Sequence, residues 1–159
     1  DAGTIDYGVN VDLTYYAQHQ LEELHAGNTV FEELDHAAPG WSISQVRSLL
    51  GAFLFTGDAV DKKVSVLSGG EKVRCMLSRM MLSGANVLLL DQPTNHLDLE
   101  SIAALNNGLE AVKCNVLFAS HDHQLVQTVA NRVFDFTSDG KLIDRKMTYD
   151  EYLESQKAD

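Results

Sequence analysis

Residues 86–98 read NVLLLDQPTNHLD, and this stretch decides the fold class. Its apolar run ends at Asp91, as when a buried strand of a parallel sheet places a carboxylate at the edge where ligands bind. A helix is predicted before it at 69–82 and after it at about 99–110, and a second apolar strand, NVLFAS, follows at 115–120. Strands that alternate with helices in this way predict an α/β fold with a mainly parallel sheet.

The composition limits the classes of function. Of 159 residues, 12 are Lys or Arg and 23 are Asp or Glu, so the formal net charge is −11. Direct nucleic-acid binding by this segment is not expected, because phosphate contacts require clustered basic side chains. Cys75 and Cys114 form no CxxC pair, which favours a reducing, cytoplasmic location. No apolar run approaches the roughly 20 residues of a membrane span, so no membrane contact is expected.

Three regions are predicted along the chain. Residues 1–20 contain alternating apolar and polar side chains around a turn at 8–10, which predicts a strand pair at 4–17. Residues 21–66 (LEELHAGNTVFEELDHAA, then ISQVRSLLGAFLF) have helical spacing and predict a small helical subdomain. Residues 67–159 hold the α/β part, with a helix at about 123–131, a hairpin that turns at 138–140 and a last helix that begins at Thr148.

The start of the helix at 69–82 carries the first candidate site. Ser68 and Glu71 have the spacing of a capping box. Gly69 and Gly70 each cost a helix about 1 kcal/mol relative to Ala. Bare glycine backbone at a helix N-terminus allows an anion such as a phosphate to approach free N–H groups, although a merely flexible entry turn is the alternative interpretation.

Two strand ends carry the second candidate site. Asp91 is suited to bind Mg²⁺ on a nucleotide phosphate through water, or else simply caps a strand–loop corner. His121 follows the strand at 115–120, where it is either a phosphate contact or a structural histidine. A metal site formed by His121 and His123 is not favoured, because positions i and i+2 at such a turn are poor tetrahedral ligands. Asp98 is placed to cap the next helix.

These motifs resemble those of an ABC-type ATPase cassette. LSGGE (67–71) is similar to the signature motif, VLLLD (87–91) to Walker B, NHLD (95–98) to the D-loop, His121 to the switch histidine and Gln18 to the Q-loop glutamine. The segments QPTNHLDLES, SHD and YDEYLES most resemble the soluble F subfamily (ABC-F), whose members carry two cassettes in one chain and act on ribosomes. The resemblance implies a P-loop NTPase (RecA-like) nucleotide-binding domain.

The resemblance also implies ligands and partners. ATP and Mg²⁺ are the expected cofactors, a second cassette is the expected partner, and the ribosome is the expected partner of the intact protein. In the family pattern Asp91, Gln92 and His121 act on the cassette's own nucleotide, while the LSGGE motif contacts the nucleotide of the partner cassette. The implied catalytic positions are Gln92 and His121, the implied nucleotide-binding residues are Gln18, Ser68, Gly69, Gly70, Glu71, Asp91 and Asp98, and the implied magnesium residues, through water, are Asp91 and Gln18.

Two features depart from the family pattern. No GxxxxGK[ST] phosphate loop occurs and the first residue is not Met, so the chain is expected to be the later two-thirds of one cassette and to be inactive alone. Gln92 stands where the family carries a catalytic glutamate, and an amide orients water but accepts no proton from it. An engineered substitution that traps the ATP-bound state and a naturally slow site both explain this residue.

Three other functions stay open. The chain also fits the ATP-binding subunit of a membrane transporter, although transporter cassettes more often carry SALD than NHLD at the D-loop. A non-hydrolysing, ATP-sensing interaction module would make Gln92 natural and functional. The head of a chromosome-maintenance protein is disfavoured, because no heptad repeat begins at either end of the sequence.

Overall fold

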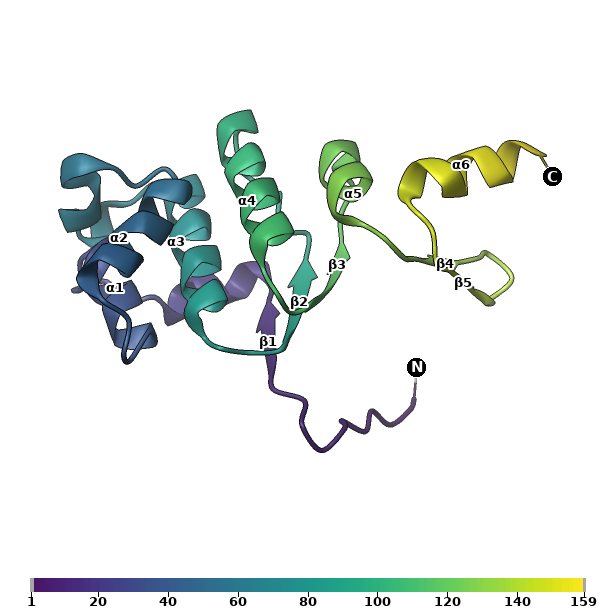
Figure 1. Cartoon of the computed structure of the whole chain (residues 1–159), viewed down its shortest axis with the longest axis horizontal. Helices are drawn as coiled ribbons and strands as arrows, with labels where there is room; N and C mark the ends of the chain where they lie inside the picture. Colours follow the sequence, from purple (N-terminus) through teal and green to yellow (C-terminus); the bar gives the residue numbers. More distant parts are fainter. Residues whose placement is uncertain (1, 159) are drawn as a thin grey trace. The chain divides into compact units, whose positions relative to one another are not determined.

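The computed structural model describes residues 2–158, apart from the side chains at positions 18, 19 and 158. The chain forms two compact units, one reaching Ala119 and one beginning at Ser120. Figure 1 shows the elements of both.

A parallel sheet forms the centre of the first unit. Its order is β1 (Leu13–Tyr16), β2 (Val87–Asp91) and β3 (Asn115–Ala119), and both strand pairs are parallel. Helix α3 (Gly69–Leu82) precedes β2, and α4 (Leu99–Ala111) joins β2 to β3 as the crossover that parallel neighbours require (Figure 1). The predicted α/β fold with a mainly parallel sheet is confirmed.

The predicted strand pair at 4–17 is wrong. Residues 2–12 form no strand, although the turn within them is present, since Val11 N–H donates to the Gly8 carbonyl at 3.1 Å. Ile5 and Val9 are almost fully exposed, so a pair here would bury nothing that offsets the loss of chain entropy. Only β1 is formed, and it pairs with β2, a strand more than 70 residues away in the sequence.

The helical subdomain is assembled from short elements. These are η1 (Gln18–Glu23), α1 (Val30–Ala37), α2 (Ile43–Ala52), η2 (Gly57–Asp61) and η3 (Val64–Val66). The helical spacing that the sequence shows from Leu21 onward does not correspond to one continuous helix. The α-helix α1 begins only after Thr29. Thr29 Oγ1 accepts from Glu32 N–H at 3.1 Å and Thr29 N–H donates to Glu32 Oε2 at 2.7 Å, which is a capping box that fixes the helix start.

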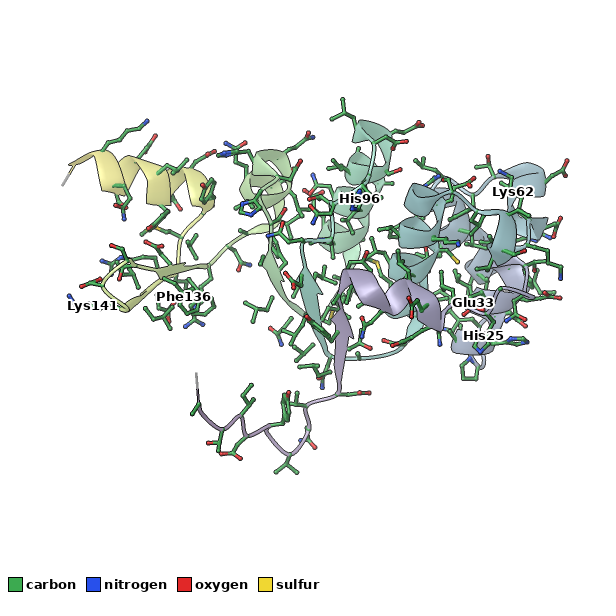
Figure 2. All side chains as sticks on the ribbon, turned by 180° about the vertical axis from the view of Figure 1, so that it is seen from behind. His25, Glu33, Lys62, His96, Phe136 and Lys141 are labelled. Atoms are coloured by element: carbon green, nitrogen blue, oxygen red, sulfur yellow. The ribbon has the colours of Figure 1, made fainter. Side chains whose placement is uncertain are left out.

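As far as its side chains are described, the subdomain core is apolar except for one carboxylate. Helices α1 and α2 bury Val30, Leu34, Val46 and Leu50 completely. Glu33 on α1 is also buried, beside His25 of the loop that precedes the helix, and Figure 2 labels both. A buried carboxylate requires polar partners.

The second unit is a helix, a hairpin and a helix. Helix α5 (His123–Val129) leads to the antiparallel pair β4 (Val133–Phe136) and β5 (Leu142–Arg145), followed by α6 (Tyr149–Ala158). The predicted hairpin is confirmed, and Gly140 has the positive φ of 80° that its turn requires. The last helix begins as predicted, since Thr148 N–H donates to Glu151 Oε2 at 2.7 Å. Among the described residues, no helix has the length and apolar character needed to cross a membrane.

Candidate functional site

The carboxyl ends of β2 and β3 lie side by side in the first unit. Asp91 is in register with Ala119, and the backbone N–H of Gln92 donates to the Ala119 carbonyl at 2.9 Å. The Asp91 side chain is exposed at this end of the sheet. A single accessible carboxylate in this place fits a Mg²⁺ ion that keeps most of its water ligands.

Gln92 has an unusual backbone and an unusual side chain. Its φ is +49°, in the left-handed region that non-glycine residues seldom adopt and that is frequent at functional sites. Its Oε1 is buried and has no hydrogen-bond partner within the described part of the chain. A buried acceptor left without a donor costs about 1–3 kcal/mol, so any donor that comes within reach of this Oε1 would stabilise the Gln92 side chain.

The start of α3 is built as the sequence predicts. Ser68 Oγ accepts from Glu71 N–H at 3.2 Å, and Glu71 Oε2 accepts from Ser68 N–H at 2.8 Å. The hydrogen bond from Ser68 N–H, with further help from Lys62, lowers the pKa of Glu71 below its ordinary value. Glu71 therefore has a capping role in this structure. Among the described residues, no atom beyond the local backbone lies within 4 Å of where a Cβ at Gly69 would be, so the space in front of this residue is open to a ligand.

The second glycine lies against the loop after β2. A Cβ on Gly70 would lie 3.4 Å from the carbonyl oxygen of His96, which itself has a positive φ of 65°. Two residues on, Asp98 Oδ1 accepts from Ser101 N–H at 2.8 Å and caps α4 as predicted. Hydrogen bonds from Ser101 lower the pKa of the Asp98 carboxyl. The LSGGE and NHLD motifs are thus neighbours within the first unit.

His121 is held at the tip of a turn in the second unit. Ser120 Oγ accepts from Asp122 N–H at 3.0 Å, and Asp122 Oδ1 accepts from Leu125 N–H at 2.8 Å and caps α5. The serine and the aspartate of the SHD triplet therefore fix the backbone, while the His121 side chain is exposed. His121 and the Asp91 edge lie in different units, and the structure describes each within its own unit. Gln18 opens η1, with one residue between it and the end of β1, but its side chain lies outside the described residues.

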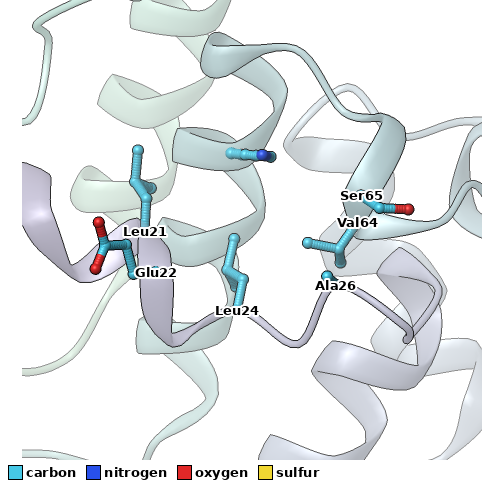
Figure 3. Close-up of a pocket in the computed structure, with 7 residues that line it drawn as sticks. Leu21, Glu22, Leu24, Ala26, Val64 and Ser65 are labelled. Atoms are coloured by element: carbon cyan, nitrogen blue, oxygen red, sulfur yellow. The ribbon is translucent and has the colours of Figure 1, made fainter.

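The structure adds features that the sequence reading missed. A groove of about 470 Å³ lies between η1, η3 and α3 (Figure 3). Its lining comes from three separate segments, so no single stretch of sequence signals it: Leu21, Glu22, Leu24, Ala26, Val64, Ser65 and Lys72.

The sequence also offers no indication of the role of Arg74. It donates from Nη1 to the Phe53 carbonyl at 3.1 Å and lies 5.1 Å from the centre of the Phe55 ring, which joins α3 to the helical subdomain.

Comparison with solved structures places the fold. The chain superimposes on a structure titled RNase-L Inhibitor with a TM-score of 0.68 at 23% identity, covering 99% of this chain and 31% of the other. It superimposes on the archaeal ribosome recycling factor aABCE1, from a complex with the ribosomal stalk protein aP1, with a TM-score of 0.69 at 23% identity and the same coverages. At this identity the likeness concerns the fold alone.

Comparison with curated sequences places the family. The chain is 52% identical over 157 residues to the uncharacterized ABC transporter ATP-binding protein YkpA of Bacillus subtilis (strain 168), covering 98% of this chain and 29% of that protein. It is 40% identical over 157 residues to the probable ATP-binding protein YbiT of Escherichia coli O157:H7, with coverages of 98% and 29%. It is 39% identical over 145 residues to ABC transporter F family member 2 of Arabidopsis thaliana, with coverages of 91% and 21%.

The chain thus spans less than a third of each of these relatives. Residues 8–95, more than half of the chain, match the model of the ABC transporter family. The chain belongs to the ABC transporter family, as part of an ATPase domain whose relatives include members of the F family.

Proposed function

We propose that this chain is the ATP-binding segment of an ABC-F type ATPase, in which bound ATP closes two cassettes and hydrolysis lets them part. The observation that carries the proposal is Gln92. It follows the exposed Asp91 at the end of β2, with a left-handed backbone and a buried Oε1 that has no hydrogen-bond partner among the described residues. Such an acceptor suits a residue that orients a water molecule toward a phosphate.

The other residues have supporting roles in this proposal. Asp91 and Gln18 would hold Mg²⁺ through its water ligands, and the ion would supply positive charge to the phosphates. His121 donates a hydrogen bond to the terminal phosphate. The open backbone at Gly69 contacts the nucleotide of the partner cassette, with Ser68, Gly70 and Glu71 shaping that helix start. Asp98 fixes the end of the loop between β2 and α4 by capping α4.

Single-turnover hydrolysis at saturating Mg-ATP tests the role of Gln92. The intact protein is compared with its Gln92→Glu variant and with Gln45→Glu, which adds the same charge at a capping box on α2 that a glutamate also satisfies. A carboxylate at position 92 is expected to raise the rate roughly a hundredfold, the scale of general-base catalysis. An unchanged rate would contradict the proposal and favour an ATP-sensing module that does not hydrolyse.

The proposed partner of the intact protein is the ribosome, in the cytoplasm. Support comes from the F-family relatives, and one structure of similar fold is of a ribosome recycling factor in complex with a ribosomal stalk protein. The net charge of −11 implies that other segments make the RNA contacts. Co-sedimentation of the intact protein with ribosomes should increase with ATP, and equal sedimentation with and without ATP would remove this part of the proposal.

The groove of the helical subdomain favours a second candidate. A subunit of a membrane transporter would need a docking surface, and the groove at Leu21, Val64 and Lys72 offers a hollow with apolar and charged side chains on the helical subdomain (Figure 3). Stable co-purification of the intact protein with a membrane protein, lost in a Val64→Glu variant, would support the transporter assignment over the ribosomal one.

A further inference from the structure

A small hollow in the second unit is shared by the switch histidine and the last helix. Its volume is about 120 Å³. Its lining comes from the SHD turn, from α5 and from the first residue of α6: Ser120, His121, Asp122, His123, Val126 and Tyr149.

The backbone of His121 is fixed, but its imidazole is not. Hydrogen bonds of Ser120 and Asp122 hold the turn on both sides of it. Within the described residues no hydrogen bond or ion pair is formed by the His121 ring itself. The orientation of the imidazole therefore depends on the side chains that line the hollow.

Tyr149 has the largest side chain in the lining of this hollow, and other aromatic rings pack against it. Its ring centre lies 5.9 Å from that of His123 at an interplanar angle of 54°, and 6.4 Å from that of Tyr152 at 23°. Tyr152 is buried and donates from Oη to Asp135 Oδ2 on β4. The Tyr149 ring thus packs between His123 and Tyr152, and Tyr152 is itself bonded to the hairpin.

A hydrogen bond attaches the first turn of α6 to α5. Gln127 Nε2 donates to Asp150 Oδ1 at 2.9 Å. The residue beside Tyr149 is thus fastened to the helix that begins immediately after the SHD turn, which keeps the first turn of α6, and with it the Tyr149 ring, next to the hollow.

We propose that Tyr149 is a positioning residue for His121, acting as the wall that restricts the imidazole to the orientation needed for phosphate contact. The proposal rests on the function proposed above for His121. It assigns a role to α6 as well, because this helix begins at Tyr149 and carries the ring that lines the hollow. The ring is required and the hydroxyl is not, because the Tyr149 hydroxyl forms no hydrogen bond with the described residues.

Histidine-selective NMR of the intact protein tests the positioning directly. The ring resonances of His121 are assigned by their loss in His121→Asn. We expect Tyr149→Leu to displace these resonances and change their tautomer-sensitive ¹⁵N shifts, whereas Tyr149→Phe and the exposed α6 control Glu154→Gln leave them in place. Unchanged His121 resonances in a folded Tyr149→Leu protein would overturn the proposal.

Hydrolysis gives a second, independent readout. In the Gln92→Glu background, Tyr149→Leu should lower kcat for ATP roughly tenfold with little change in KM, since misplacing a catalytic group by about 1 Å costs up to a hundredfold. The loss should disappear when His121→Asn is also present. An equal loss in both backgrounds would overturn the proposal. If His121→Asn alone leaves hydrolysis unchanged, the function proposed for His121 is wrong, and the NMR comparison still decides whether Tyr149 positions the ring.

Discussion

The guanidinium of Arg79 on α3 lies 3.3 Å from the carboxylate of Glu33 on α1. Glu33 is only 2% exposed, and it also accepts from Asn28 Nδ2 at 2.9 Å and from His25 N–H at 3.3 Å (Figure 2). A charge buried this deeply is tolerated only when it is paired. The pair therefore fixes α3, the helix that begins with the LSGGE glycines, to the helical subdomain.

Removal of the Glu33 carboxylate should loosen α3. Glu33→Ala leaves Arg79 and Asn28 without their partner and opens a cavity. We expect the free energy of unfolding to fall by about 3 kcal/mol. This is the low end for a broken buried pair, because Arg79 is 30% exposed. Hydrogen exchange of the intact protein should be faster in peptides from 28–37 and 69–82. The exposed neighbour Glu32→Gln keeps its capping box and should change stability by less than about 0.5 kcal/mol. Similar effects of the two substitutions would show that the buried pair has no special role.

Close packing of α4 depends on a glycine. A Cβ on Gly108 would lie 2.9 Å from Cζ of Phe53, a fully buried ring at the end of α2. Gly108→Ala should therefore destabilise the protein by about 1–2 kcal/mol, because overpacking exceeds the gain in helix propensity. Gly51→Ala on α2 is the matched control: no described residue lies within 4 Å of its added methyl group, so stability should stay equal or rise by up to about 1 kcal/mol. Thermal unfolding of the two variants gives the comparison, and a stabilising Gly108→Ala would contradict the packing argument.

The parts of the structure that the sequence predicts correctly are those with local causes. The boundaries of α3 follow from the Ser68–Glu71 capping box and from an apolar face at helical spacing. Asp98 and the Thr148–Glu151 box define two further helix starts in the same way. Asp91 lies at the end of β2 as predicted because a run of apolar residues in a parallel sheet ends where its burial ends.

The parts that the sequence does not predict depend on distant residues. The alternation at 4–17 indicates a strand pair, but only β1 is formed, because its partner is β2 and not its own neighbour. The approach of Gly70 to His96 arises from how α3 and the loop after β2 meet, and the left-handed backbone of Gln92 lies in the same loop. No residue pattern within either segment encodes those distances.

The start of α3 should be sensitive to acid. Hydrogen bonding from Ser68 N–H lowers the pKa of Glu71 relative to an ordinary value of 4.5. A carboxyl with a lowered folded-state pKa contributes stability above the ordinary value, and this contribution is lost as the pH falls through the lowered value. Glu71→Gln keeps a capping amide without the charge, so the difference in unfolding free energy between the native protein and this variant should shrink as the pH falls below about 4.5. A constant difference from pH 7 to pH 3 would show that the charge is irrelevant.

The two cysteines should differ in reactivity. Cys75 is fully buried on α3, and burial, with a smaller effect of the Glu33 charge, raises its pKa to about 12. Cys114 is partly exposed, and burial raises its pKa less strongly. Because the thiolate is the reactive form, Cys114 should be alkylated first at pH 8, while Cys75 should react only when the protein is unfolded. Peptide mass mapping after timed alkylation measures both rates, and equal rates in the native protein would contradict the burial of Cys75.

One face of the parallel sheet is open, and this should limit the solubility of the 159-residue chain when it is produced alone. Tyr15, Leu89 and Leu117 are in register across β1, β2 and β3, and Tyr15 and Leu117 are 42% and 51% exposed. Parallel sheets in α/β proteins are normally covered on both faces, so this apolar row is a site for association. Leu117→Glu should raise the monomer fraction measured by light scattering. Leu99→Glu adds the same charge at a more exposed apolar residue outside the row and should have little effect. An equal gain from both variants would mean that net charge, and not the open face, controls association.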